Sequence, residues 1–211
     1  MRSKAGAACI LLLLFIGCGS REPKSQTRRV EPVRVPESFR VRFETSKGAF
    51  IVEVTRAWAP RGADRFHELI RERFYDNARF FRVVPNFVVQ FGLSGSPKVS
   101  QLWSQAFIPD DPVVESNRAG TITYAKRGPA TRTTQVFINL MDNQRLDSMG
   151  FAPFGRVMEG MDVVSNLYKG YGDAPPGGIG PVQDRILLEG NDYLERQFPR
   201  LDYIKTARIV E

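Results

Sequence analysis

Residues 80–90 read FFRVVPNFVVQ, two short runs of aromatic and β-branched residues separated by Pro85-Asn86. Proline and asparagine between two such runs predict a turn that joins two antiparallel strands. Arg82 and Gln90 lie eight residues apart, one in each run, and Phe87 lies between them. Because side chains alternate along a strand, this spacing allows Arg82 and Gln90 to point to the same face. The stretch therefore predicts a hairpin that presents an arginine, a phenylalanine and a glutamine together.

The rest of the chain also alternates short apolar runs with turn residues. Strands are expected at residues 39–43, 50–54, 79–84, 87–91, 120–125, 135–140, 154–157 and 203–210. Helices are expected from Pro60 to about Arg73 and over residues 159–168, and residues 184–198 predict an extra helix with Gly190 as its weak point. The pattern predicts a mainly β fold, a closed eight-stranded antiparallel barrel capped by two helices. The extra C-terminal helix is expected to be a packed appendage rather than a partner surface.

The N-terminus has the pattern of a targeting segment. A basic start is followed by an apolar run that ends in FIGC at residues 15–18. This ending resembles a bacterial lipobox, which implies cleavage after residue 17 and a lipid on Cys18. The protein would then be held in the cell envelope of a bacterium, on the periplasmic side or at the outer membrane. An ordinary secretory signal or an uncleaved anchor is the alternative.

Residues 18–38 are rich in proline and charge and are expected to be a flexible tether, with the folded domain at 39–211. The two cysteines, Cys9 and Cys18, both lie upstream of that domain, so no disulfide is expected in it.

Charge and histidine content argue against several function classes. The net charge is +7, but Lys and Arg are scattered and form no block interleaved with aromatic residues, so no nucleic-acid partner is expected. The excess positive charge is consistent with a solvated protein surface or with a position near anionic lipid. The single histidine, His67, cannot build a two-histidine zinc site, and no G-x-S-x-G motif accompanies it. We expect His67 at the surface or the core edge, and we expect no metal or other cofactor.

Four further segments follow the first stretch in order: GTITYA at 120–125, TQVFI at 134–138, LD at 146–147 and FAPFGRV at 151–157. Together with residues 80–90 they resemble the cyclophilin signature. In that signature an aromatic residue, Arg, two aliphatic residues and Pro precede a Phe, and Gln lies three residues after the Phe. The resemblance runs from about residue 39 to residue 172 and resumes near the C-terminus. It implies a peptidyl-prolyl cis-trans isomerase that assists the folding of envelope or secreted proteins without a cofactor.

The chemistry of that reaction fits these residue types. Rotation about an X-Pro bond crosses a barrier of about 18–20 kcal/mol. Lowering it takes an apolar slot for the proline ring and a donor to the prolyl nitrogen of the twisted state. The resemblance implies that Arg82 is this donor and that Gln90 orients it. It also implies a substrate-binding set, with Phe87, Phe137 and Leu146 as pocket walls, Val88, Gln135 and Phe151 beside them, and the backbone around Ala125 and Lys126 pairing with the residues before the proline.

Several positions depart from the family pattern, among them Val88 in place of a usual Met and Phe91 in place of a usual Gly. Arg145 stands where many cyclophilins carry a Trp that matters for cyclosporin, Phe151 where a His is usual, and Lys126 where Asn is common. Arg145, Phe151 and the altered loop at residues 92–114 keep a second hypothesis open, a catalytically weak peptide-binding or scaffold lipoprotein. Under either hypothesis the partners are proline-containing polypeptides and, through Cys18, a membrane, and a monomer is expected.

Overall fold

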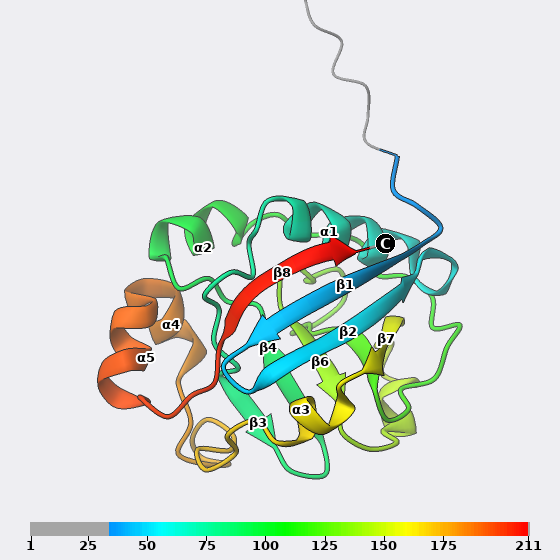
Figure 1. The fold of residues 1–211 in the computed structure, drawn as a ribbon. Coiled ribbons are helices and arrows are strands. Elements are labelled where there is room, and N and C mark those ends of the chain that lie inside the picture. Colours follow the sequence, from blue (N-terminus) through cyan, green and yellow to red (C-terminus); the bar gives the residue numbers. More distant parts are fainter. Residues whose placement is uncertain (1–33, 211) are drawn as a thin grey trace, which may run out of the picture. The chain divides into compact units, whose positions relative to one another are not determined.

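Eight strands, paired antiparallel throughout, form one sheet in the computed structural model (Figure 1). The structure describes residues 34–210; the predicted signal segment, Cys18 and most of the predicted tether lie outside these residues. The strands are β1 (Ser38–Thr45), β2 (Gly48–Thr55), β3 (Arg82–Val84), β4 (Val88–Phe91), β5 (Thr121–Tyr124), β6 (Val136–Asn139), β7 (Pro153–Glu159) and β8 (Ile204–Val210). Each corresponds to a predicted strand with bounds shifted by a few residues.

The sheet is curled but open, so the predicted closed barrel is wrong. Its strand order is β3-β4-β6-β5-β7-β2-β1-β8, which leaves β3 and β8 as the two edges. Backbone hydrogen bonds join the segment just before β3 to the start of β8, such as the one from Asn77 N–H to the carbonyl of Ile204 at 2.8 Å. A longer ladder cannot form there because β3 has three residues and the chain before it turns through positive φ at Arg73 and Asn77.

The two predicted capping helices are both present and both shorter than expected (Figure 1). Helix α1 (Pro60–Arg71) follows the short 3₁₀ turn η1 (Arg56–Trp58), begins with proline, where the missing N–H costs no hydrogen bond, and buries Phe66 and Ile70. Helix α3 (Met161–Ser165) begins only after Gly160, whose φ of 77° separates it from β7.

The predicted extra helix is a pair of helices. Helix α4 (Gln183–Glu189) and helix α5 (Asn191–Gln197) meet at Gly190, which has a φ of 62°. Their buried side chains pack against Phe81 and Leu93 in a second hydrophobic cluster, so the expected packed appendage is confirmed. Helix α2 (Pro97–Trp103), which the sequence did not predict, packs against α4.

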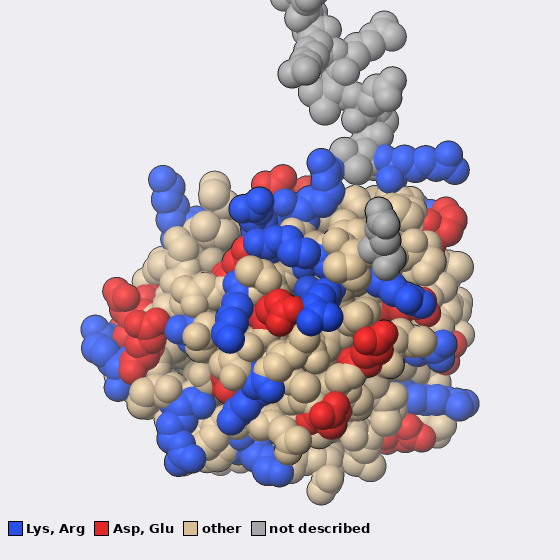
Figure 2. Space-filling model, viewed as in Figure 1, with Lys and Arg blue, Asp and Glu red and all other residues tan. Residues whose placement is uncertain are grey.

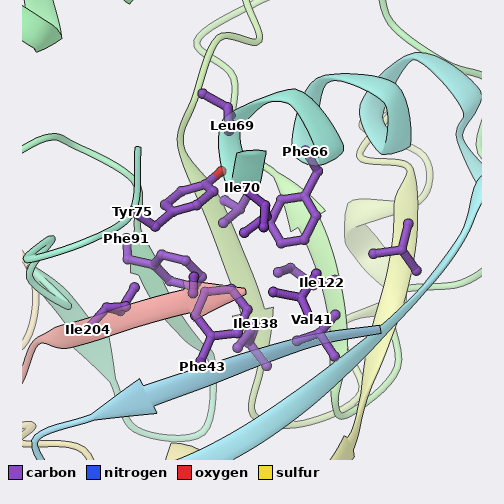
Figure 3. Packing of buried hydrophobic residues seen from close by; sticks show 14 of the residues in the cluster. Val41, Phe43, Phe66, Leu69, Ile70, Tyr75, Phe91, Ile122, Ile138 and Ile204 are labelled. Carbon is purple, nitrogen blue, oxygen red and sulfur yellow. The ribbon is translucent and has the colours of Figure 1, made fainter. Parts of the chain in front are cut away.

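The main core lies inside the curl and is rich in aromatic side chains (Figure 3). Phe43 stacks on Phe50 with ring centroids 4.7 Å apart and meets Phe91 edge-on at 5.8 Å. Eight of the fifteen phenylalanines belong to this core, which explains most of the phenylalanine content. Val35, upstream of the predicted start of the domain, also packs against it.

His67 lies at the edge of this core, as the sequence suggested. Its side chain is largely buried, and its ring meets Phe39 edge-on at 5.1 Å. Burial lowers the pKa of the imidazole below its usual 6.5.

The face drawn in Figure 2 shows Lys and Arg interspersed with Asp and Glu. Several Lys and Arg side chains of the protein are paired with acids; Arg40, for example, lies 3.3 Å from Glu53, and Arg208 lies 2.7 Å from Asp76. Among residues 34–210, no helix combines the length and the apolar character needed to cross a membrane.

Candidate active site

The β3–β4 hairpin places Arg82 directly opposite Gln90. The turn between the strands passes through Asn86, which has a positive φ of 57° that asparagine tolerates better than most residues. Opposed residues of an antiparallel pair project from the same face, and here the Arg82 Nη1 donates to Gln90 Oε1 at 3.1 Å. The shared face predicted from the spacing of these residues is therefore confirmed.

Arg82 is held on its other side by a residue that the sequence analysis missed. Its Nε and Nη2 donate to the two carboxylate oxygens of Asp173 at 2.9 and 2.7 Å. Hydrogen bonding from Arg82 is the main reason that the pKa of Asp173 lies below the usual carboxyl value. The only signal in the sequence was an acid within a Pro/Gly-rich loop, which says nothing about which cation it meets.

Gln90 extends this polar chain into the neighbouring strand. Its Nε2 donates to Gln135 Oε1 at 2.9 Å, just before β6. The predicted site residues Arg82, Gln90 and Gln135 are thus joined in one series of hydrogen bonds that begins at Asp173. This series restricts the orientation of the guanidinium.

An apolar slot lies beside these polar groups and is separate from the main core. Its floor and walls are Val88, Phe137 and Leu146, each no more than 6% exposed. The partly buried residues packed against them are Phe87, Ala125 and Phe151. The Arg82 guanidinium carbon lies 5.4 Å from the centre of the Phe87 ring. The structure therefore brings all the predicted wall residues together next to Arg82.

A buried polar network fixes the wall that carries Leu146, which ends the 3₁₀ turn η2 (Gln144–Leu146). Asp147 accepts hydrogen bonds from the backbone and side chain of Asn117 at 2.9 and 2.7 Å. Asn117 also donates to the carbonyl of Phe151 at 2.8 Å. Burial alone raises the pKa of Asp147, but hydrogen bonds from Ser116 and Asn117 outweigh it, so the pKa is lowered.

The segment predicted to pair with substrate is partly engaged within the protein. Ala125 N–H donates to the carbonyl of Gln135 at 3.0 Å, so a bound peptide has to use other backbone groups of this segment. The Lys126 ammonium lies 3.0 Å from Asp110 and 5.5 Å from the centre of the Phe151 ring. The charged end of Lys126 is therefore anchored beside the slot rather than free in solvent.

The slot opens into a cavity of about 570 Å³, whose lining includes all ten predicted residues of the site. Part of its wall comes from helices α2 and α4, through residues such as Trp103 and Leu187. Sequence reasoning missed these residues because α2 was not predicted and because nothing local indicates that α4 folds back to the hairpin.

Arg145 is the departure with the clearest structural consequence. Its guanidinium lies 4.9 Å from the centre of the Phe87 ring, so Phe87 contacts two cations.

Within residues 34–210, no three His, Cys, Asp or Glu side chains gather as a metal site would require.

Comparisons with known proteins agree with this geometry. Residues 40–186 match the family described as cyclophilin type peptidyl-prolyl cis-trans isomerase/CLD. A peptidyl-prolyl cis-trans isomerase-like 1 protein of Aspergillus niger is 33% identical over 158 residues, which cover 72% of this chain and 97% of that protein. A peptidyl-prolyl cis-trans isomerase of the bacterium Acinetobacter baylyi is 31% identical over 132 residues, with coverages of 60% and 70%.

A solved structure shares the fold. The crystal structure of a cyclophilin type isomerase from Cryptosporidium parvum matches with a TM-score of 0.61 at 19% identity, covering 82% of this chain and 98% of that one. The family match spans more than half of the chain and includes the hairpin, the slot and Asp173. The chain therefore belongs to the cyclophilin-type peptidyl-prolyl cis-trans isomerase family and is an enzyme with that activity.

Proposed function

We propose that the groove binds an X-Pro segment of an extended polypeptide, with the proline ring in the apolar slot and the prolyl nitrogen facing Arg82. The slot offers apolar walls of Val88, Phe137 and Leu146. Burial of the pyrrolidine ring in such a slot stabilises binding at roughly 25 cal/mol for each Å² of apolar surface removed from water.

The arrangement of Arg82 is the observation that carries this proposal. A guanidinium has five N–H donors. Three are engaged, on Nε, Nη1 and Nη2, by Asp173 and Gln90. One N–H on Nη1 and one on Nη2 therefore remain for a substrate.

The two remaining donors suit the twisted state of the X-Pro bond. In the planar amide the nitrogen lone pair is delocalised into the carbonyl, and it becomes an acceptor only as the bond twists. A donor that meets this lone pair binds the twisted state more strongly than either planar state. That difference in binding is what lowers the barrier.

The test is a proline-isomerisation assay on the full chain in mild detergent, with exchange of an Ala-Pro peptide followed by NMR. Arg82→Ala removes two charge-assisted hydrogen bonds to the substrate, one to the prolyl nitrogen and one to the adjacent carbonyl, each worth about 1.5 kcal/mol or more. A loss of about 3 kcal/mol in the transition state corresponds to roughly a hundredfold lower kcat/KM. Arg79→Ala is the matched control, since Arg79 lies on the same segment and pairs with Glu195 outside the cavity lining.

Unchanged activity in Arg82→Ala would remove Arg82 from the catalytic site. A wild-type chain that binds the peptide but leaves its exchange rate unaltered would instead favour the hypothesis of a peptide-binding or scaffold protein. The departures at Arg145 and Phe151 motivate that second hypothesis, because both side chains border the slot.

We further propose that the enzyme is a bacterial lipoprotein that acts on proteins of the cell envelope and assists their folding. The support is the basic and apolar start of the chain, the FIGC ending at residues 15–18 and the charged, proline-rich segment after it. Expression in a bacterium with a fatty-acid analogue should label the protein and place it in the membrane fraction. Cys18→Ser should abolish the label, whereas Cys9→Ser, the control within the same segment, should keep it.

A further inference from the structure

The loop after α3 is folded around one acidic residue. Asp173 accepts two hydrogen bonds from backbone N–H groups of its own loop. Gly180 N–H donates to the Asp173 carbonyl at 2.7 Å, and Ala174 N–H donates to Asp173 Oδ1 at 2.8 Å. A Cβ on Gly178 would lie 2.7 Å from the Asp173 nitrogen, and one on Gly180 would lie 2.9 Å from its carbonyl oxygen. The glycines of this loop therefore allow the chain to close tightly on Asp173.

The carboxylate held by this loop meets Arg82 in a two-point contact. Both oxygens accept from the guanidinium, through Nε and Nη2, in the parallel geometry that fixes the plane of an arginine side chain. Gln90 supplies a third fixed point on Nη1. The side chains of Arg82 and Asp173 are 22% and 36% exposed, so the pair lies at the rim of the groove and is open to substrate.

We infer that Asp173 is a positioning residue for the isomerase reaction, and that the loop of residues 172–182 exists at this place to hold its carboxylate. Asp173 orients Arg82 so that the two uncommitted N–H groups face the slot. The inference rests on the proposed role of Arg82. Among the residues that the structure describes, the Arg82 side chain makes hydrogen bonds only to Asp173 and Gln90. Without Asp173, only the hydrogen bond to Gln90 would remain.

A positioning role acts on the chemical step more than on binding. The apolar walls that hold the proline ring do not involve Asp173. Asp173→Ala is therefore expected to lower kcat about tenfold while KM stays within about twofold. Asp173→Asn keeps an acceptor for Arg82 Nε–H and should retain more activity than the alanine variant.

The matched control is Asp64→Ala. Asp64 makes the same two-point contact with Arg56, at 2.7 and 3.1 Å, and the exposures of the two side chains, 41% and 32%, are similar. This pair lies between η1 and α1 and outside the cavity lining. A change in activity of Asp64→Ala similar to that of Asp173→Ala would overturn the inference, because loss of any such pair would then suffice.

A double-mutant cycle in the full chain separates positioning from general stability. If Asp173 acts through Arg82, adding Asp173→Ala to Arg82→Ala causes no further loss of kcat. An additive loss would overturn the inference. The ¹⁵N resonance of Arg82 Nε provides a direct readout, and it should shift or broaden in Asp173→Ala but not in Asp64→Ala.

The outcomes also separate this inference from the proposed site. Loss of activity in Arg82→Ala with full activity in Asp173→Ala would overturn the positioning role and keep Arg82 as the catalytic donor. Full activity in Arg82→Ala would contradict the proposed site itself.

Discussion

Replacing Asp111 by alanine is expected to destabilise the protein strongly, although Asp111 is remote in sequence from every element that it supports. Its side chain is 2% exposed and accepts a hydrogen bond from Arg132 Nη2 at 3.0 Å. It also accepts from the backbone N–H groups of Arg61 and Gly62, at 3.1 and 2.9 Å. Asp111 therefore caps the first turn of α1 from another part of the chain and neutralises a buried arginine.

The magnitude follows from these contacts. Removing one partner of a buried ion pair costs about 3–5 kcal/mol, and loss of a helix cap costs about 1 kcal/mol. Arg132 keeps a second carboxylate, Asp110, at 3.3 Å, which places the ion-pair cost at the lower end of its range. We expect Asp111→Ala to lower the free energy of unfolding by about 3–4 kcal/mol, or Tm by about 10 °C.

Urea denaturation followed by circular dichroism measures this change. Asp111→Asn is a second variant of nearly unchanged volume, so a large loss there as well assigns the effect to charge and hydrogen bonding rather than to a cavity. Asp184→Ala is the control, because its pair with Arg127 is more than 70% exposed on both sides and should contribute little. A loss below about 1 kcal/mol in Asp111→Ala would refute the reasoning, since two helix N–H groups and a buried guanidinium would then lack their partner without consequence.

Three further predictions concern the site and its surroundings. Arg82→Lys keeps the charge, but an ammonium group lacks the planar set of donors that binds Asp173, Gln90 and a substrate at once. We therefore expect kcat/KM to fall at least about tenfold, and near wild-type turnover would contradict this. Burial lowers the pKa of His67, so the neutral form is favoured in the folded state; the stability it contributes is complete above the unfolded value of 6.5 and is lost as pH falls towards the folded pKa. His67→Phe should therefore flatten the pH dependence of unfolding in this range, and an unaltered profile would show that His67 does not cause it. Because Arg145 and not Trp borders Phe87, cyclosporin should inhibit weakly, and a nanomolar inhibition constant would contradict this.

Local pattern was sufficient for the hairpin and most of the secondary structure. The period-two alternation and the Pro85-Asn86 turn placed Arg82 opposite Gln90, because register in a short hairpin is set by the turn itself. Helix α1 and the eight strands were also predicted, since each depends on residues close in sequence. The ends of the elements were less accurate, because positive φ at Arg73 and Gly160 ends or delays helices in a way that periodicity does not indicate.

Closure of the sheet and the wall formed by α2 and α4 depended on contacts between distant segments. The barrel was expected to close, but a closed ladder needs two long edge strands in register, and β3 is too short. The split of the extra helix was indicated by Gly190, whereas its packing against Phe81 and Leu93 was a matter of tertiary structure.

The sequence by itself determined the hairpin that carries Arg82 and Gln90, and its resemblance to the cyclophilins indicated the slot walls. Only the tertiary structure decided that Asp173, 91 residues after Arg82, holds the guanidinium, and that Asp111 caps α1. The physical reason is that a hydrogen bond between an acid and a distant cation leaves no periodic trace in the chain. Many Asp–Arg pairings are compatible with the same composition, and the packing of the whole domain selects one of them.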